Sequence, residues 1–301
     1  MKKIIENKKI QLIFVFCGIV VSLLIMIFLV NKVFKLKDRL DNSKVEKINS
    51  VNKYEDELKI SKAVKIPIIT FHRVVDHDTK VKHFSDNEWV NDLDVTEKEL
   101  KWLYDNGWKS IDLDEFYSWY MNEIDYDKKT FVITIDDGDA EAYYNILPLL
   151  DKYDFKATLF VIGNTVPDIT PKLNEPNYSR VGKDVIEKLR KEKSRLHFES
   201  HSFAQHDFAK NGDPIASTFS IEELNKDFDN NSEYNFKYYA YPYGYYNSDI
   251  LSVISNRKDI KMAFTFGNFN YATRLNNRYE IDRIKISGNT TFEEFKKWFQ
   301  Y

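Results

Sequence analysis

The chain has 301 residues and a formal net charge of -3, so it is long enough to form one sizeable hydrophobic core. The slight acidic excess gives no indication of nucleic-acid binding. Cys17 is the single cysteine, which excludes an internal disulfide framework.

An apolar run from Leu12 to Val30 lies near the start of the chain and is broken only by Gly18 and Ser22. Its length matches the roughly 20 residues of a membrane-spanning helix. A cleaved signal peptide is the alternative, but its apolar core is shorter and ends at a small-residue site, which is missing here. We interpret residues 10–30 as an uncleaved single-pass anchor. Lysines flank both ends, so charge does not fix the orientation, and the short tail 1–9 favours a cytoplasmic N-terminus.

Residues 31–65 are charged, lack glycine and proline, and contain scattered aliphatic side chains. This pattern predicts a partly helical stalk, with a solvated linker as the alternative. The globular domain is expected to span residues 66–301. Its first strand, Ile66–Phe71, has Pro67 near the start, where a missing N–H is tolerated, and runs directly into His72.

From there, predicted helices and strands alternate along the chain. Further strands are expected at residues 131–135, 157–162, 196–200, 237–241, 261–266 and 279–286. Helices are expected at residues 96–106, 112–121, 141–152, 183–193, from 220, at 248–256 and from 291. This alternation predicts an α/β domain built on a parallel sheet, either open or closed into a barrel.

The strand that begins at Phe131 ends in two adjacent acids, Asp136 and Asp137, followed by Gly138. Parallel-sheet domains carry their active sites at the carboxyl ends of the strands. Neighbouring side chains on a strand point to opposite faces, so one acid can bind a metal while the other handles a proton. Taken alone, the motif is equally compatible with a solvated Asp-Asp-Gly turn.

Two later segments favour a functional interpretation. His201 and His206 follow another predicted strand, and their spacing does not place both on one helical face, so a loop must bring them together. Two imidazoles and one carboxylate form a three-ligand site for a divalent metal, with positions left for water and substrate. The segment Tyr241-Pro242-Tyr243-Gly244 is either a simple turn or a source of a backbone N–H for a developing oxyanion.

The segment Thr134-Ile135-Asp136-Asp137-Gly138 resembles the T-F-D-D-G motif of polysaccharide deacetylases, the NodB-homology or carbohydrate esterase family 4. His201 to His206 resembles the family's H-[ST]-x-x-H motif with one extra residue. That spacing, the A-Y-P-Y-G sequence at 240–244 and the F-H-R-V sequence at 71–74 are similar to the poly-N-acetylglucosamine deacetylase branch. The resemblance covers residues 66–301 and implies a distorted (β/α) barrel.

The resemblance also implies a role for each residue of the motifs. Asp137, His201 and His206 would hold a divalent metal, which is commonly zinc in this family. Asp136 would act as the general base. The backbone N–H of Tyr243 would help to stabilise the oxyanion.

The chain departs from the usual family pattern in two places. Most members protonate the leaving amine with a C-terminal Leu-x-His, but no histidine follows His206 here. In the exopolysaccharide branch an N-terminal histidine takes this role, which corresponds to His72. The arginine that usually precedes Pro-Tyr is replaced by tyrosine, so Arg283 is expected either to orient Asp136 or to form a surface salt bridge.

The function implied is metal-dependent hydrolysis of N-acetyl groups from a poly-N-acetylglucosamine-like exopolysaccharide, by a domain anchored to the cell membrane on its outer side. An acetylated amino-sugar polymer and the membrane are then the expected partners. Proteins of exopolysaccharide synthesis and export are possible further partners. One alternative is a deacetylase or esterase acting on peptidoglycan, chitin oligomers or O-acetylated glycan. Another is a non-catalytic glycan-binding assembly protein.

Overall fold

A computed structural model of the chain describes Leu29 and residues 31–33, 35–37, 62–174, 176–268 and 270–300. The predicted cytoplasmic tail, almost all of the predicted anchor and most of the predicted stalk lie outside the described residues. Within the described residues, no helix combines the length and the apolar character needed to cross a membrane. The chain divides into two compact units, Met1–Ile60 and Ser61–Tyr301, and the second contains the sheets described below.

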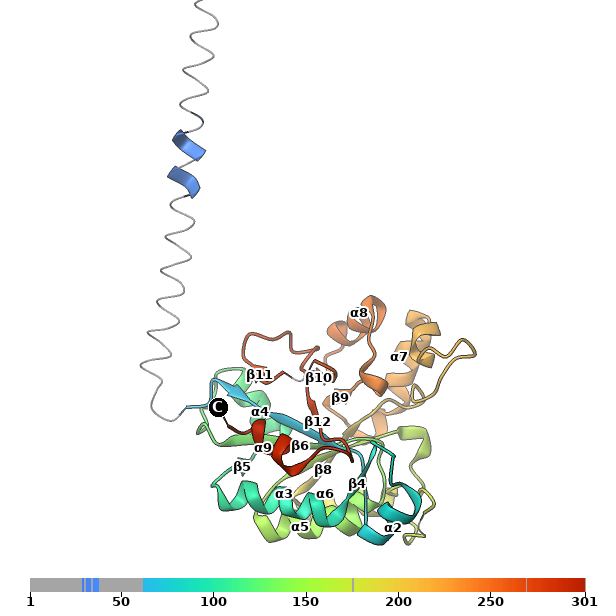
Figure 1. Cartoon of the computed structure of the whole chain (residues 1–301). Coiled ribbons are helices and arrows are strands. Elements are labelled where there is room, and N and C mark those ends of the chain that lie inside the picture. Colours follow the sequence, from blue (N-terminus) through green and yellow to red (C-terminus); the bar gives the residue numbers. More distant parts are fainter. Residues whose placement is uncertain are drawn as a thin grey trace, which may run out of the picture. The chain divides into compact units, whose positions relative to one another are not determined.

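A parallel sheet forms the centre of the second unit (Figure 1). Its strands are β2 (Ile68–Phe71), β5 (Lys109–Ser110), β6 (Thr130–Ile135), β7 (Ala157–Val161), β8 (Leu196–Ser200), β9 (Tyr238–Ala240), β10 (Met262–Phe264) and β12 (Ile284–Lys285). In space they follow the order β10-β9-β8-β7-β6-β2-β12, with β5 beside β6. Two small sheets join β1 (Lys65–Ile66) to β11 (Ala272–Thr273) and β3 (Arg73–Val75) to β4 (Val90–Asp92). The prediction of an α/β domain with a parallel sheet is confirmed.

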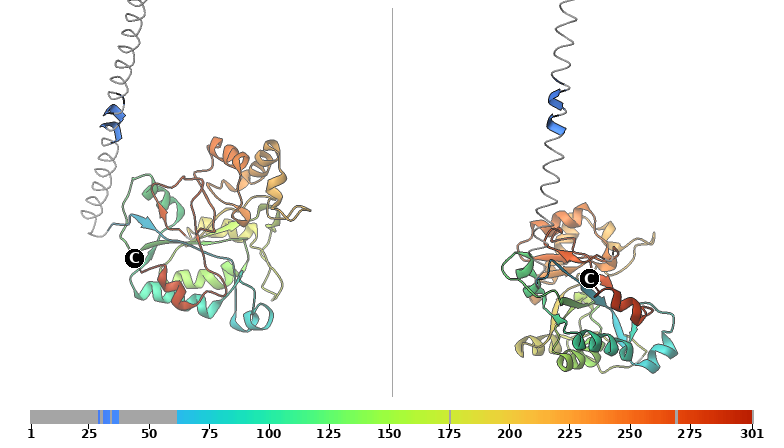
Figure 2. Two further views of the ribbon diagram at one scale, coloured as in Figure 1. Left: turned by 45° about the horizontal axis from the view of Figure 1, so that its top comes forward. Right: turned by 60° about the vertical axis from the view of Figure 1, so that its left-hand side comes forward.

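Helices surround this sheet in two groups (Figures 1 and 2). Their bounds are α2 (His77–His83), α3 (Leu93–Asp105), α4 (Leu113–Tyr120), α5 (Leu147–Tyr153), α6 (Lys183–Lys191), α7 (Ile221–Asn230), α8 (Ser248–Asn256) and α9 (Phe292–Lys297). Helices α3, α5 and α6 lie together below the sheet in Figure 1, whereas α7 and α8 lie side by side at its upper right.

The chain between β10 and β12 connects the two edges of the sheet, because β10 and β12 are its outermost strands. Ile281 forms a parallel bridge with Phe264 of β10, and three residues later β12 pairs with β2. The sheet is thereby curved toward a barrel, and Arg283 lies between its two ends. A continuous strand over 279–286 is therefore wrong, because this segment pairs with β10 at one end and with β2 at the other.

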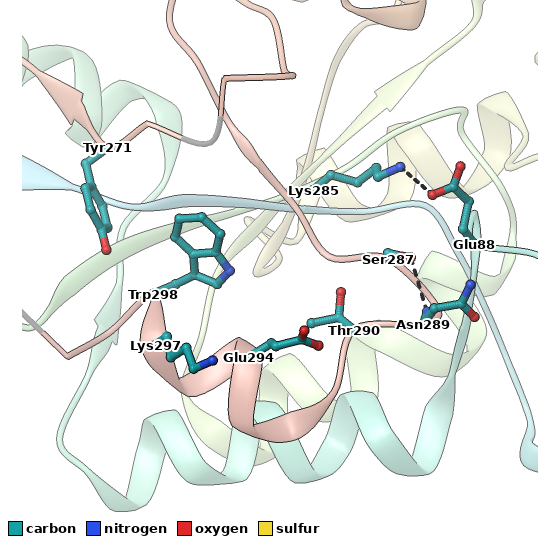
Figure 3. A pocket seen from close by; sticks show the side chains of 9 residues that line it. All are labelled: Glu88, Tyr271, Lys285, Ser287, Asn289, Thr290, Glu294, Lys297 and Trp298. Atoms are coloured by element: carbon teal, nitrogen blue, oxygen red, sulfur yellow. Dashed lines mark hydrogen bonds and ion pairs between the residues drawn. The ribbon is translucent and has the colours of Figure 1, made fainter.

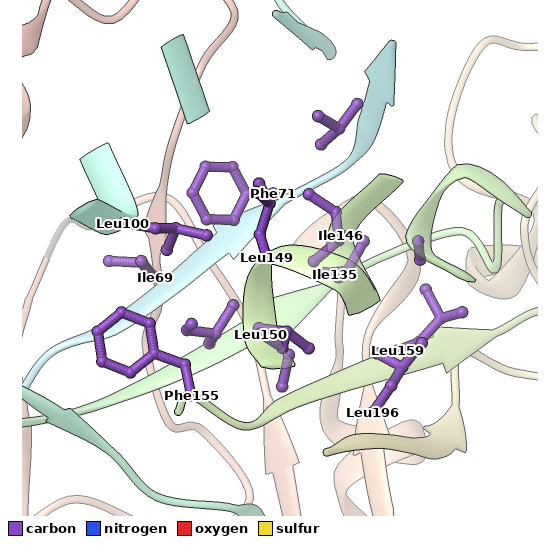
Figure 4. Close-up of a cluster of buried hydrophobic side chains, with 14 of the residues drawn as sticks. Ile69, Phe71, Leu100, Ile135, Ile146, Leu149, Leu150, Phe155, Leu159 and Leu196 are labelled. Carbon is purple, nitrogen blue, oxygen red and sulfur yellow. The ribbon is translucent and has the colours of Figure 1, made fainter. Parts of the chain in front are cut away.

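Central strand residues alternate between two hydrophobic clusters. Ile69 and Ile135 pack against the helices on one face, as Figure 4 shows. Ile68 and Val132 belong to a second cluster on the opposite face. Each fully buried aliphatic side chain stabilises the fold by about 1.5–3 kcal/mol. The alternation also directs Asp136, the residue after Ile135, away from the first cluster.

Two predicted helices begin differently from the sequence-based expectation. Helix α3 starts at Leu93 rather than at Thr96, because the Asp92 side chain accepts hydrogen bonds from the N–H groups of Asp94 and Val95. The helix expected at 141–152 opens with a π-helical turn, Ala142–Ile146, before α5. Pro148 in the first turn of α5 has no N–H to donate to the usual carbonyl, which favours this wider turn.

Glu99 is a buried acid on α3, with 1% of its surface exposed. Burial, partly offset by the Lys98 ammonium, raises the pKa of its carboxyl to about 8. Because this pKa is higher in the folded than in the unfolded chain, the associated stability is present at low pH and is lost as the pH rises toward 8. We expect Glu99→Gln to change the free energy of unfolding little near pH 5 and to raise it by about 2–4 kcal/mol near pH 9.

Urea unfolding of both proteins at the two pH values measures this difference. Glu97→Gln is the matched control, because Glu97 lies on the same helix and is partly exposed beside Lys152. A Glu99→Gln protein whose stability falls with pH as steeply as that of the wild type would contradict the expectation.

Candidate metal centre

The predicted site residues gather at the carboxyl ends of parallel strands. They are His72 after β2, Asp136 and Asp137 after β6, His201 and His206 after β8, and Tyr243 after β9. These strands are neighbours or near neighbours in the sheet, and parallel strands end at a common edge. The site therefore follows from the strand order, although its members are up to 171 residues apart in the chain.

Asp137, His201 and His206 form a compact group of three possible metal ligands, whose donor atoms all lie within 4.8 Å of one another. Asp137 Oδ1 is 3.0 Å from His206 Nε2 and 3.5 Å from His201 Nε2. This oxygen is buried and accepts no hydrogen bond from any residue that the structure describes. A buried oxygen left without a hydrogen bond beside two imidazole nitrogens fits a divalent cation.

Hydrogen bonds to the other ring nitrogens support the same assignment. His201 Nδ1 lies 2.8 Å from the carbonyl oxygen of Ala240, which makes Nδ1 the protonated nitrogen and leaves Nε2 with a free lone pair. His206 Nδ1 lies 3.3 Å from the hydroxyl of Tyr243. Both Nε2 atoms are thus oriented toward Asp137, as metal-ligating histidines require.

The charge state of Asp137 also fits cation binding. Burial alone would raise the pKa of this carboxyl, but while no metal is bound, Nε2–H groups of His201 and His206, with His72 nearby, hold its pKa well below the usual range. Asp137 is consequently an anion at neutral pH. A carboxylate that is already ionised can bind a cation without first losing a proton.

Arg283 binds Asp136 inside the sheet. Its two terminal nitrogens donate to the two oxygens of Asp136 at 2.7 and 2.8 Å, and both side chains have an exposed fraction of 0%. The expectation of a surface salt bridge is therefore wrong, and the orienting contact is present. Burial would raise the pKa of Asp136, but Arg283 and then His201 outweigh burial, so the pKa is lowered.

His72 faces Asp136 across the site, with its Nε2 atom 4.0 Å from Asp136 Oδ2. Trp89 packs against the imidazole in a T-shaped contact with ring centroids 4.7 Å apart, and Phe266 lies farther away at 6.3 Å. Burial lowers the pKa of His72 despite the nearby anions Asp137 and Asp136. Sequence reasoning missed Trp89, because no motif links a tryptophan on an irregular segment to a histidine 17 residues earlier.

Three loops of the site contain a residue with a left-handed backbone. Asp137 has φ 73°, Ser202 has φ 73° and Tyr243 has φ 57°. Such a conformation is costly for a tyrosine and tends to occur at functional sites. A Cβ atom at Gly138, which has φ 76°, would approach Val161 Cα to 3.2 Å, so this turn requires glycine.

Two ion pairs that no sequence motif predicts lie close to the Asp-Asp-Gly turn; one is buried, and in the other only the acid is buried. Arg73 Nε donates to Glu141 Oε1 at 2.6 Å, and Arg180 pairs with Asp139. Arg73 also donates to the carbonyl oxygens of Pro176 and Asn177. These contacts attach the loop before α6 to the metal-binding turn and so hold the turn in place.

Comparison with known proteins agrees with this geometry. Residues 123–259 match the family model for polysaccharide deacetylases. The poly-beta-1,6-N-acetyl-D-glucosamine N-deacetylase of Staphylococcus aureus strain MRSA252 is 30% identical over 226 residues, which is 71% of this chain and 75% of that protein.

Two solved structures have the same fold. The Streptococcus pyogenes deacetylase PplD has a TM-score of 0.63 at 22% identity and covers 79% of this chain and 100% of its own. IcaB from Ammonifex degensii has a TM-score of 0.61 at 16% identity and covers 80% of this chain and 99% of its own. The NodB-type fold expected from the sequence is thereby confirmed. With its match to the family model and its 30% identity to the staphylococcal N-deacetylase, the chain belongs to the polysaccharide deacetylase family.

Proposed function

We propose that the protein removes N-acetyl groups from a poly-β-1,6-N-acetylglucosamine-like exopolysaccharide, with one bound divalent metal, zinc, at its centre. The convergence of Asp137, His201 and His206 beside the Asp136–Arg283 pair carries this proposal. The similarity to the staphylococcal enzyme, which is named for a β-1,6-linked polymer, supports the choice of substrate.

In this proposal Asp137, His201 and His206 hold the metal. When bound, a metal of this kind lowers the pKa of a water ligand toward neutrality and polarises the acetyl carbonyl. Asp136, ionised and oriented by Arg283, accepts the proton of the attacking water. The backbone N–H of Tyr243 donates a hydrogen bond to the developing oxyanion.

His72 protonates the nitrogen of the departing amine. His72 Nε2 lies 4.0 Å from Asp136 Oδ2, so the proton donor (His72) and the proton acceptor (Asp136) can both reach the amide that is hydrolysed. Burial lowers the pKa of His72, so a protonated His72 is a stronger acid than a free imidazolium and gives its proton readily to an amine.

Acetate release from defined oligomers tests the substrate. The full-length protein loaded with Zn²⁺ is incubated with a β-1,6-linked and a β-1,4-linked N-acetylglucosamine hexamer, and free acetate is measured. We expect release from the β-1,6 hexamer at a much higher kcat/KM. Release from the β-1,4 hexamer alone would contradict the substrate and favour chitin or peptidoglycan, and glycan binding without any release would favour a non-catalytic role.

His72→Gln is expected to lower kcat for N-acetyl hydrolysis by about 10²–10³-fold, because an amine leaves poorly without a proton. Hydrolysis of an aryl acetate should fall only several-fold, because a phenolate leaves without protonation. Parallel assays of glycan and ester measure the two rates. An equal loss on both substrates would contradict the acid role. Full turnover of an O-acetylated glycan by the variant would favour an O-acetyl ester as the natural substrate.

The proposed location follows from the sequence alone. Residues 1–9 form a cytoplasmic tail, 10–30 a transmembrane anchor, 31–65 a stalk and 66–301 the deacetylase domain on the outer side. The apolar run supports the anchor. Protease added to intact cells should degrade the deacetylase domain while the protein sediments with membranes, and complete protection from protease would contradict the orientation.

A further inference from the structure

A groove of about 560 Å³ lies beside α9, outside the group of metal-ligand candidates (Figure 3). Tyr271 and Trp298 lie at one end of it, with ring centroids 6.4 Å apart. The polar side chains of Ser287, Asn289 and Thr290 line the part nearer β12. Aromatic rings beside neutral hydrogen-bonding groups suit a ligand with both apolar and hydroxylated faces, such as a sugar.

The charged groups in and beside this groove include no excess of acids. Lys285 Nζ pairs with Glu88 at 2.8 Å. Glu294 accepts hydrogen bonds from the backbone N–H and the hydroxyl of Thr291 at the start of α9, and Lys297 lies one helical turn later. Two acids and two lysines line the groove, and Lys65 Nζ lies 4.4 Å from the ring centroid of Tyr271, so the groove has no excess of negative charge. An uncharged ligand therefore fits the groove better than a polycation does.

Side-chain contacts connect the groove to the catalytic site. Lys285 Nζ lies 4.0 Å from the ring centroid of Trp89, the residue after Glu88. The same indole packs against His72, and 39% of Trp89 is exposed. Two successive contacts thus lead from the wall of the groove to the imidazole that faces Asp136.

We propose that this groove is a remote subsite that binds acetylated, uncharged units of the polymer while another unit of the same chain occupies the metal centre. The inference rests on the proposed function. It adds that the affinity of the enzyme for its substrate depends on the length and the acetylation of the polymer. Units that have already been deacetylated carry ammonium groups, and the groove offers them no excess of negative charge. The enzyme should therefore bind long acetylated stretches more tightly than short or deacetylated ones.

Binding without turnover tests the groove separately from the reaction. Isothermal titration calorimetry on the full-length Asp136→Asn protein compares an acetylated β-1,6 dimer, the acetylated hexamer and the fully deacetylated hexamer. We expect the acetylated hexamer to bind at least tenfold more tightly than either of the others. Adding Trp298→Ala to this variant should weaken hexamer binding by about tenfold, which corresponds to a loss of about 1.4 kcal/mol of binding free energy from one aromatic contact. The affinity for the dimer should stay within twofold.

Controls separate binding from folding. Tyr104→Ala removes a half-exposed aromatic ring of α3 that packs against Tyr153 and does not line the groove, and it should change neither affinity. Because Trp298 also packs against the core, Asn289→Ala on the exposed loop serves as a second variant and should weaken hexamer binding by about threefold.

Equal affinities for the dimer and hexamer, or hexamer binding unchanged by both groove variants, would overturn the proposal. Tighter binding of the deacetylated hexamer would overturn it as well. Absence of acetate release by the wild-type protein would instead count against the proposed function, and the calorimetric comparison would still decide on the groove.

Discussion

Replacing Asp136 by asparagine is expected to lower kcat for acetate release by about 10²–10⁴-fold, the usual contribution of a general base. The amide has the same shape as the carboxylate but cannot accept the proton of the attacking water. One carbonyl oxygen still accepts a hydrogen bond from Arg283, but the buried guanidinium loses its counter-charge, so urea unfolding of the variant is needed to show that it is folded under the assay conditions. Acetate release at saturating substrate measures the loss.

Metal stoichiometry is the control for this variant. Asp136 belongs to the Arg283 pair and not to the group formed by Asp137, His201 and His206. The asparagine variant should therefore bind the same amount of Zn²⁺ as the wild type. Activity within tenfold of the wild type at full metal loading would show that another group removes the proton.

Replacing Arg283 by leucine is expected to destabilise the protein by about 3–5 kcal/mol, because Asp136 would become a buried charge without a partner. Loss of the guanidinium also raises the pKa of Asp136, since Arg283 is the largest of the influences that lower it. The base is then ionised only at higher pH. The acidic limb of the kcat/KM profile should therefore move to higher pH.

Arg283→Lys is the matched variant, because lysine keeps the charge but not the paired hydrogen bonds of the planar guanidinium. The acidic limb of its kcat/KM profile should stay close to that of the wild type. Its free energy of unfolding and its kcat should both be lower than those of the wild type. Urea unfolding and pH–rate profiles measure both effects. A leucine variant with wild-type stability and an unchanged acidic limb would contradict an orienting role for Arg283.

The parts of the site that could be predicted from sequence lie in short motifs at strand ends. Asp136 and Asp137 end an unbroken β-branched and aromatic run, and His201 follows the next strand but one. A parallel sheet brings such ends to one edge. Strand patterns and the family motifs together therefore predict that these side chains meet, without any knowledge of their distances.

Long-range partners could not be predicted in the same way. The sequence is compatible with two roles for Arg283. Which of the two it has depends on how residues 281–285 cross from β10 to β2. Trp89 lies in a segment without apolar periodicity, where Lys80 orders the backbone by donating to the carbonyls of Phe84 and Asn87. Tertiary hydrogen bonds of this kind leave no repeating pattern in the sequence.

Titration of the metal-depleted, full-length protein with Zn²⁺ tests the central claim most directly, with acetate release from the β-1,6 hexamer as the readout. Activity should rise from near zero and reach a plateau when the group of Asp137, His201 and His206 has taken up one equivalent of metal; the more exposed second group of possible ligands, His77, Asp92 and Asp94, should leave the activity unchanged. Asp137→Ala should show neither Zn²⁺ binding at the group of Asp137, His201 and His206 nor the activity. Full acetate release by the metal-depleted wild type, or one tightly bound Zn²⁺ without any release, would contradict a metal-dependent deacetylase centred on these residues.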